Sequence, residues 1–293
     1  MTLASVVQVL LSGLQIGSIY ALLALSYYVI ITATGILNFA QGEWMMVSGV
    51  LGVTLLGFGL PYPIAFCAGI VGATVLAIAA ERFVIAPLQT RHASEAIMLL
   101  ALFGVMLVVR YGTGAIHGRL DEALPGPAGT HVFRLGASVF VFSQSLVIYG
   151  ATVAIFTGVM LWMRFTWLGS SLRVAAIDPL AAQLVGVNLN TVRTVAFALG
   201  GLIAAIVAWL YAPLFAAGYL TGAIPGIKGF IALFVGGTGS PLGALVGGLL
   251  LGLMEVAAAR YLPSIYAEGI AFALLMIILF LRPNGLIGPM RAP

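Results

Sequence analysis

Long uninterrupted apolar runs recur along this chain, and they restrict its fold more than any other feature. A transmembrane helix needs ~20 predominantly apolar residues, and most of the runs approach or exceed that length. The runs do not alternate between apolar and polar residues, which favours helices over the strands of a membrane barrel. Apolar residues make up 62% of the chain and charged residues only 7%, whereas a soluble protein has ~25% charged residues to cover its surface. The sequence therefore predicts an all-α, polytopic transmembrane helical bundle.

The runs add up to about eight or nine hydrophobic spans, some of them broken. Residues 229–257 are too long for one simple span, and the glycines and proline of 236–241 divide them into a half-helix and a full span at 241–257. No linker or low-complexity segment appears, so residues 1–293 are predicted to form a single transmembrane domain. The other expected spans are 6–31, 44–60, 64–80, 96–112, 138–163, 194–216 and 263–281.

Arginines at the ends of the spans indicate how the chain is oriented. Cytoplasmic loops of membrane proteins carry an excess of Lys and Arg, which places residues 81–95, 164–193 and 282–293 in the cytoplasm. Alternation then puts the long loop 113–137 outside. The charges of 81–95 are expected to form a solvated face, and Arg110 is expected to snorkel from the end of its span. The net charge of +4 thus reflects topology and not a nucleic-acid-binding patch.

A polar interruption at residues 32–43 contains Asn38, Gln41, Gly42 and Glu43. An acidic residue at membrane depth is costly unless it is paired or hydrated, and Glu43 lies where a helix restarts, so the helix dipole favours its carboxylate. One interpretation is a capping loop at the membrane face. The other is a broken helix that borders a translocation path, by analogy with the discontinuous helices of transporters.

The stretch 164–193 is the longest polar interruption predicted to lie in the cytoplasm. Asp178 can cap a helix and Pro179 fits its first position; Leu180–Val185 can make barely two turns before Gly186 adopts the left-handed conformation that ends a helix. Such a short helix is not stable alone, so it needs the bundle or a second protein to pack on it. The spacing by itself also fits an ordinary loop with a chance cap.

Small residues recur at helical spacing in two spans. Gly13 and Gly17 lie four residues apart in the first, and Gly239, Gly243 and Gly247 repeat that interval near the end of the chain. Such spacing allows another helix to approach closely. We expect both sets to mark faces of close helix packing.

Several catalytic motifs are missing from the sequence. The chain contains no phosphate-binding loop, because Lys228 is followed by Gly229 instead of Ser or Thr. It also lacks the His-Glu-x-x-His and Gly-x-Ser-x-Gly motifs, and its histidines have no spacing that suggests a metal site. We therefore expect neither an ATPase, an intramembrane enzyme nor a metalloprotein. Ionisable residues inside the spans are scarce, which also counts against a proton-coupled secondary carrier.

Three stretches that together cover nearly the whole chain resemble one family. They are Ala-Ala-Ile-Asp-Pro-Leu-Ala-Ala-Gln-Leu-Val-Gly-Val-Asn (175–188), the N-terminal pair 17–25 and 36–43, and the C-terminal pair 236–248 and Arg-Pro-Asn-Gly-Leu-Ile-Gly (282–288). They are similar to motifs in the permease subunits of ABC importers, most closely those of the branched-chain amino acid uptake family. The resemblance implies a transport subunit without enzymatic activity in the bacterial inner membrane.

The resemblance also assigns roles to individual residues. It implies that 164–193 contains the coupling helix that docks on the ATP-hydrolysing subunit, with the small residues of its pattern at Ala181, Ala182 and Gly186. The leading acidic residue of the wider importer motif is absent. Many members carry His where this chain has Gln41, so a titrating role at that position does not carry over.

The implied partners are a second homologous permease chain, two ATP-binding subunits and a soluble extracytoplasmic binding protein. ATP and magnesium would belong to the ATP-binding subunits, and no cofactor or metal is expected on this chain. The implied substrates are branched-chain or other hydrophobic amino acids, with urea, short amides and small carboxylates as the cargo of related members. The alternative is a secondary carrier or channel that works without an ATPase.

Overall fold

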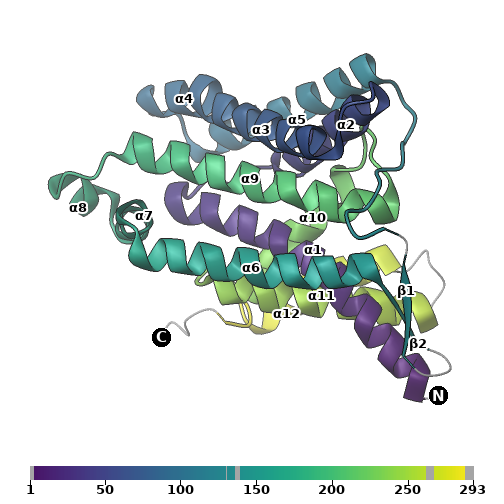
Figure 1. Ribbon diagram of the computed structural model, residues 1–293. Coiled ribbons are helices and arrows are strands. Elements are labelled where there is room, and N and C mark those ends of the chain that lie inside the picture. Colours follow the sequence, from purple (N-terminus) through teal and green to yellow (C-terminus); the bar gives the residue numbers. More distant parts are fainter. Residues whose placement is uncertain (1–2, 130, 136–138, 262–266, 288–293) are drawn as a thin grey trace. The chain divides into compact units, whose positions relative to one another are not determined.

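The computed structural model is mainly helical and describes all residues except 1–2, 130, 136–138, 262–266 and 288–293. A π-helical turn, η1 (Glu81–Ile85), joins α3 to α4. The helices, several of which are labelled in Figure 1, are α1 (Leu3–Thr34), α2 (Gln41–Gly57), α3 (Tyr62–Ala80), α4 (Ala86–Thr90), α5 (Glu95–His117), α6 (Ser143–Phe165), α7 (Trp167–Ile177), α8 (Pro179–Leu184), α9 (Leu189–Phe215), α10 (Ala223–Gly236), α11 (Pro241–Tyr261) and α12 (Ala267–Leu281).

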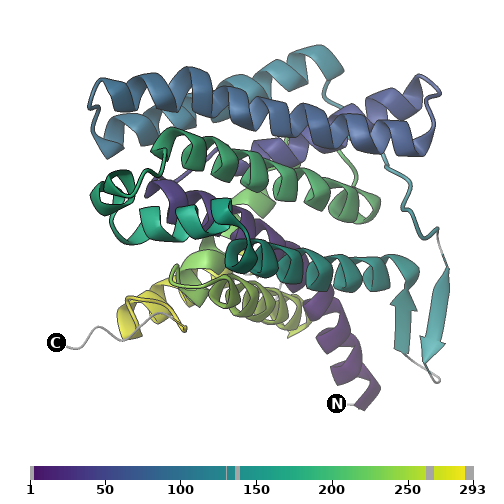
Figure 2. The same cartoon turned by 60° about the vertical axis from the view of Figure 1, so that its left-hand side comes forward.

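The chain is mostly helical, as the sequence predicted, and one short β-hairpin is the addition. Strands β1 (Val132–Leu135) and β2 (Val139–Phe142) form an antiparallel hairpin in which Val132 lies opposite Phe142. Figure 2 shows this hairpin directly before α6. Val, Phe and Leu fill both strands and favour this conformation. The predicted external loop is also shorter than expected, because α5 continues to His117.

Six helices are long and apolar enough to cross a membrane in the described part of the chain. The expected count of about eight or nine spans is therefore not confirmed, although a multi-pass membrane protein is. The difference lies in the shorter apolar helices. At a rise of ~1.5 Å per residue, the 17 residues of α2 and the 14 of α10 cover about 25 Å and 21 Å, less than the ~30 Å hydrocarbon core.

The chain divides into two compact units. Unit 1 comprises Met1–Leu25, Pro125–Phe156 and Ile227–Pro293, and unit 2 comprises Ser26–Leu124 and Thr157–Gly226. The prediction of a single domain over 1–293 stays a prediction. Unit 2 contains both segments singled out by sequence for function, the break at 32–43 and the loop 164–193.

In unit 2, α2, α3 and α9 pack against one another. Ser48 of α2 joins them through hydrogen bonds, since its hydroxyl donates to the Ala205 carbonyl (3.0 Å) and accepts from the Trp209 indole (3.1 Å). Small residues bring the helices close: a Cβ added at Gly69 would meet the Ser48 carbonyl oxygen at 2.7 Å. Trp209 is buried, and Tyr62 packs edge-on against its ring.

In unit 1, glycines bring α1 and α11 into backbone contact. A Cβ at Gly17 would lie 2.8 Å from the Leu249 Cα, and one at Gly13 would lie 2.9 Å from the Leu253 Cα. This confirms that Gly13 and Gly17 form a close-packing face. Gly243 and Gly247 likewise pack against the end of α10. Gly239 precedes α11 and is exposed, so its inclusion in that face was wrong.

The two C-terminal motifs meet in unit 1. Leu286 and Ile287 donate backbone hydrogen bonds to the Val235 and Gly236 carbonyls at 3.0 and 2.9 Å. These carbonyls are at the end of α10, where a helix leaves acceptors without an internal partner. A Cβ at Gly285 would lie 2.5 Å from the Gly237 Cα, which explains why glycines occupy both motifs.

Candidate translocation segment and docking loop

The break after α1 has a local cause. The Thr34 hydroxyl donates to the Ile30 carbonyl (2.7 Å) and accepts from the Ile36 amide (3.1 Å), and Gly35 adopts a φ of 67°. A positive φ costs glycine little and ends the helix there. The chain then restarts as α2 at Gln41, as the polar residues of the sequence predicted.

Asn38 and Gln41 hold the break in place through side-chain hydrogen bonds. The Asn38 amide donates to the Gln41 carbonyl oxygen (3.1 Å), and its own oxygen accepts from the Ala40 amide (3.0 Å). Gln41 in turn donates to the Gly200 carbonyl of α9 at 2.7 Å. Both side chains are fully buried, so the segment is a helix break inside unit 2 and not a solvated capping loop.

Glu43 is buried and paired with Arg110 of α5. The Arg110 Nε donates to Glu43 Oε1 at 3.0 Å, and Nη2 contacts the same oxygen. The prediction that Arg110 snorkels to the surface was therefore wrong. Its partner lies 67 residues earlier in the chain. The pair meets the requirement that a charge in a membrane span be compensated.

Two helix N-termini meet at Gly42. A Cβ added to Gly42 would collide with the carbonyl oxygen of Gly222, which lies just before α10, and one added to Gly226 would lie 3.0 Å from the Gly42 Cα. Close by in the sequence, Glu43 Oε2 and the Trp44 indole N–H are buried and have no hydrogen-bond partner among the described residues. Unsatisfied buried polar atoms are rare in native proteins and often mark functional positions. The sequence did not predict that Gly222 joins this segment.

The stretch 164–193, which is predicted to be cytoplasmic, contains the two short helices α7 and α8 where one was predicted. Thr166 caps α7 by accepting from the Gly169 amide (3.0 Å), and Asp178 caps α8 by accepting from the Leu180 and Ala181 amides at 2.9 and 3.1 Å. The predicted short helix, its cap and its proline are thus confirmed as structure. Gly186 has a φ of 86°, also as predicted.

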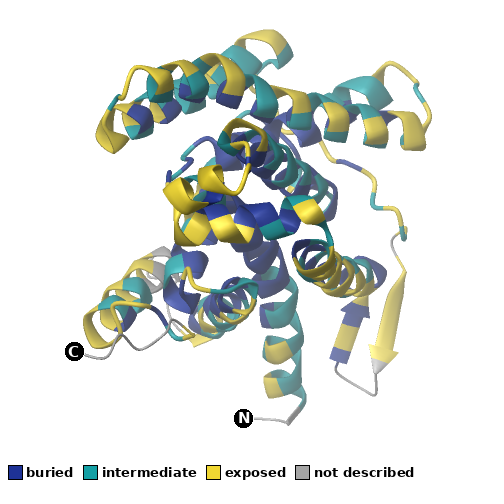
Figure 3. Cartoon of the chain, turned by 90° about the vertical axis from the view of Figure 1, so that its left-hand side faces the viewer, coloured by how far each residue is buried: buried dark blue, intermediate teal, exposed yellow. Residues whose placement is uncertain are grey.

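Burial divides the residues of α8 into two sets. Ala182 is fully buried within this chain, whereas Leu180 and Leu184 are 74% and 88% exposed. Figure 3, which views the chain from this end, shows mostly exposed residues on α8. Ala182 therefore packs α8 on its own chain and is not free to line an external interface, contrary to its predicted position. Ala181 and Gly186 are exposed, and their contact with a partner stays a prediction.

The prediction of a solvated charged face at 81–95 holds for Arg82, Arg91, His92 and Glu95, which are exposed, but it was wrong for Glu81. Residues 81–90 continue the helix of α3 through η1 and α4, and Glu81 is buried against Arg193 of α9, with Arg193 Nε 2.5 Å from Glu81 Oε1. In unit 1, Lys228 Nζ lies 2.6 Å from Glu255 Oε1. Sequence reasoning missed all these pairs, although an acidic residue inside an apolar run signals that a basic partner is needed.

The family described as "Branched-chain amino acid transport system / permease component" matches residues 9–279. The chain belongs to this family. Its members are permease subunits of ABC importers and not enzymes, which confirms both the recognised family and the prediction that this chain is a transport subunit. The scarcity of intramembrane charges, by contrast, was a poor argument against a carrier, because buried ion pairs are present.

Curated relatives agree along nearly the whole length. The "High-affinity branched-chain amino acid transport system permease protein LivH" of Escherichia coli strain K12 is 29% identical over 96% of this chain and 95% of its own. The corresponding protein BraD of Pseudomonas aeruginosa is 30% identical with the same coverage. The "Ribose import permease protein RbsC" of Escherichia coli strain K12 is 26% identical over 92% of this chain and 84% of its own.

One solved structure supports the fold. The structure titled "PsaBC from Streptococcus pneumoniae in complex with Fab" superposes with a TM-score of 0.51 over 95% of this chain and 91% of its own, at 13% identity. At that identity the likeness shows a shared fold and nothing more about function.

Proposed function

We propose that this chain is a permease subunit of a bacterial inner-membrane importer that passes branched-chain amino acids, delivered by a soluble binding protein, into the cytoplasm. A second homologous permease chain would complete the path, and two ATP-binding subunits would supply the energy. The observation that carries the proposal is the family match over residues 9–279, together with relatives named for branched-chain amino acid transport.

The polar break is the proposed path element of this subunit. Asn38, Gln41 and Glu43 are buried at the restart of a short helix, and Gly42 brings the starts of two short helices together. Discontinuous helices of this kind border substrate sites in other transporters. Because Glu43 is paired with Arg110, its role would be to hold the break in shape and not to carry a proton.

The α7–α8 segment is the proposed docking element for the ATP-binding subunit. Several large apolar side chains of this segment are exposed, and exposed apolar patches mark interaction sites. Ile177, Leu180 and Leu184 are all more than two-thirds exposed. Arg164 and Arg173 on the same loop fit a cytoplasmic location.

Reconstitution tests the function. Proteoliposomes containing this chain, its partner permease and the ATP-binding subunits are supplied with the binding protein and radiolabelled L-leucine. ATP-dependent uptake is expected, with competition by L-isoleucine and L-valine but not by ribose or urea. Uptake of ribose or urea in place of leucine would show that the proposed substrate is wrong and that this chain transports the cargo of other relatives. Leucine uptake without any ATP-binding subunit would favour the secondary carrier.

A pair of matched variants tests the docking element. Leu184→Asp removes an apolar contact and adds a charge to α8, so we expect loss of the ATP-binding subunit during purification in mild detergent, with the permease still folded. Leu120→Asp makes the same change at a residue that is 80% exposed in the predicted external loop, and it should retain the subunit. Normal assembly of Leu184→Asp would show that α8 does not dock.

A further inference from the structure

One face of α9 connects the docking loop to the polar break. Arg193, Phe197 and Gly200 recur at intervals of four and three residues, which places them on the same side of a helix. All three are buried in unit 2. At a rise of ~1.5 Å per residue, this face is about 10 Å long.

The first contact on this face is a buried ion pair. The Arg193 Nε donates to Glu81 Oε1 at 2.5 Å, and its Nη2 donates to Asn190 Oδ1 at 3.0 Å. The Thr194 hydroxyl donates to Glu81 Oε2 at 2.8 Å. Both carboxylate oxygens of Glu81 are therefore satisfied, and the pair fixes the start of α9 against the start of η1.

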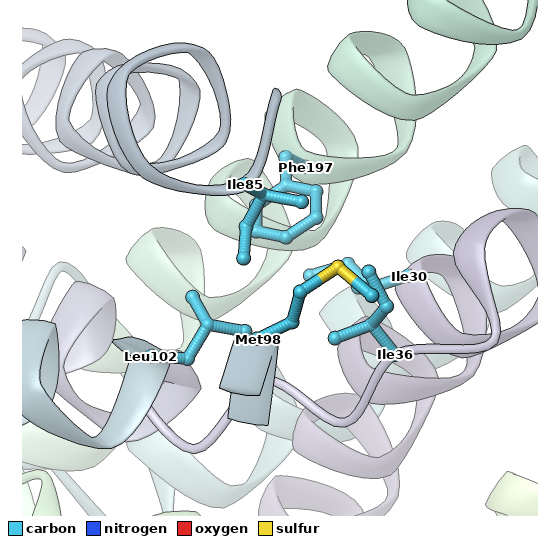
Figure 4. Close-up of a cluster of buried hydrophobic side chains, with 6 residues drawn as sticks. All are labelled: Ile30, Ile36, Ile85, Met98, Leu102 and Phe197. Atoms are coloured by element: carbon cyan, nitrogen blue, oxygen red, sulfur yellow. The ribbon is translucent and has the colours of Figure 1, made fainter. Parts of the chain in front are cut away.

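The second contact is apolar and joins the same two helices next to the ion pair. Phe197 follows Arg193 by four residues on α9, and Ile85 follows Glu81 by four residues on η1. Figure 4 shows Phe197 and Ile85 side by side, in a fully buried cluster with Ile30 and Ile36. The last two flank the break at Gly35, so the cluster joins α9 to both sides of that break.

The third contact reaches the polar break itself. The Gly200 carbonyl accepts the hydrogen bond of Gln41, and a Cβ added at Gly200 would meet Ile30 Cδ1 at 2.7 Å. Only a glycine allows α9 and α1 to approach this closely. The restart of α2 is therefore positioned directly by α9.

The docking end of α9 is joined tightly to α8. Only Val185–Asn188 separate the two helices. Within this link the Val187 amide donates to the Ala182 carbonyl (3.0 Å), and Asn188 caps α9 by accepting from the Asn190 amide (3.0 Å). Ala182 is also fully buried, so we expect a movement of α8 to act on the start of α9.

We propose that this face of α9 transmits the movement of the docking helix to the polar break, and that Glu81 and Arg193 are the positioning residues of that link. The inference rests on the proposed function. The π-helical turn at Glu81 fits the role, since π-turns are uncommon and often occur at functional positions. Such coupling requires an element with two states whose equilibrium both sites bias, and the proposal assigns this role to α9.

Stability alone does not require an ion pair at this position. A buried ion pair can often be replaced by apolar residues of similar volume without loss of stability, whereas removal of one partner leaves an uncompensated charge. The double variant Glu81→Leu with Arg193→Met should therefore still fold, while it lacks the ion pair that is proposed to transmit the movement. Arg82→Met is the matched control, because Arg82 is the exposed neighbouring arginine of η1.

The experiment uses the complete complex in proteoliposomes and measures ATP hydrolysis with and without the binding protein loaded with L-leucine. We expect the double variant to assemble, but its ratio of stimulated to basal hydrolysis should fall at least about five-fold, the lower end of typical allosteric coupling. Arg82→Met should keep the native ratio. A native ratio in the assembled double variant would overturn the inference.

Two further outcomes are distinguishable. If the native complex shows no stimulated hydrolysis or leucine uptake, the proposed function fails. If the double variant does not assemble, the single variants Glu81→Asp and Thr194→Val test the inference in its place. Glu81→Asp keeps the charge at a shorter side chain, and Thr194→Val removes one hydrogen bond to Glu81. Each should lower the ratio in an assembled complex, and native ratios in both would overturn the inference.

Discussion

At the scale of single residues, the buried ion pair between Glu43 and Arg110 constrains the start of α2, directly after the polar break. Glu43 is 1% exposed, so removal of Arg110 would leave a buried carboxylate without compensation, which costs ~3–5 kcal/mol. We predict that Glu43→Ala and Arg110→Ala each lower the free energy of unfolding by about this amount, and that the double variant is less destabilised than the sum. Thermal unfolding in detergent measures this.

The control for this cycle is Arg82→Ala, whose effect should stay within ~0.5 kcal/mol because the side chain is exposed. Additive effects of Glu43→Ala and Arg110→Ala would contradict the pairing. Because Glu43→Ala is expected to destabilise the protein, a loss of uptake in this variant must be corrected for the amount of folded protein before it is assigned to the transport path.

Gly42 is the second residue whose environment predicts a clear outcome. An added Cβ would collide with the backbone of Gly222, and overpacking of a well-packed interior costs ~1–3 kcal/mol. We predict that Gly42→Ala destabilises the permease by that amount and lowers uptake. Gly104→Ala is the matched control, since a Cβ at Gly104 would meet no atom within 4 Å from the rest of the described chain outside its own helical turn. Equal stability of the two variants would show that the contact at Gly42 can relax.

At the scale of elements, α8 illustrates what local sequence can predict. Its cap, its proline and the glycine after it follow from backbone chemistry within a few residues, and all three appear at the expected positions. The residues that α8 presents outward depend on the face that packs on the bundle. That face is set by tertiary contact, so Ala182 was assigned to the interface although it is buried.

The cap predicts a mild phenotype for α8. Asp178 accepts hydrogen bonds from two amides at the start of the helix, and loss of such a cap costs ~0.5–2 kcal/mol. We predict that Asp178→Ala increases amide hydrogen exchange in α8 while the rest of unit 2 is unchanged, and that it weakens docking less than Leu184→Asp. Asn188→Ala provides a comparison at the neighbouring cap of α9.

At the scale of the whole molecule, composition and periodicity were enough to predict a multi-pass helical protein and most of its long helices. The number of membrane spans was not predicted correctly, because an apolar run does not reveal how much of the bilayer its helix crosses. The buried ion pairs were missed for a different reason. Glu43 and Arg110 are 67 residues apart, and Glu81 and Arg193 are 112 apart, so no local spacing connects them.

Orientation in the membrane is the remaining whole-molecule property, and the arginines predict it. Residues 164–193 should face the cytoplasm and the loop after α5 the outside. Single cysteines at Gln183 and Leu120, both exposed, are placed in a Cys67→Ser background, because Cys67 is itself exposed. A membrane-impermeant maleimide added to intact cells should label position 120 only, and position 183 should react after permeabilisation.

These sites avoid the cap at Asp178, so altered folding cannot explain the result. Labelling of 183 in intact cells would place α8 outside, where no ATP-binding subunit can reach it, and would remove the docking proposal together with the coupling through α9.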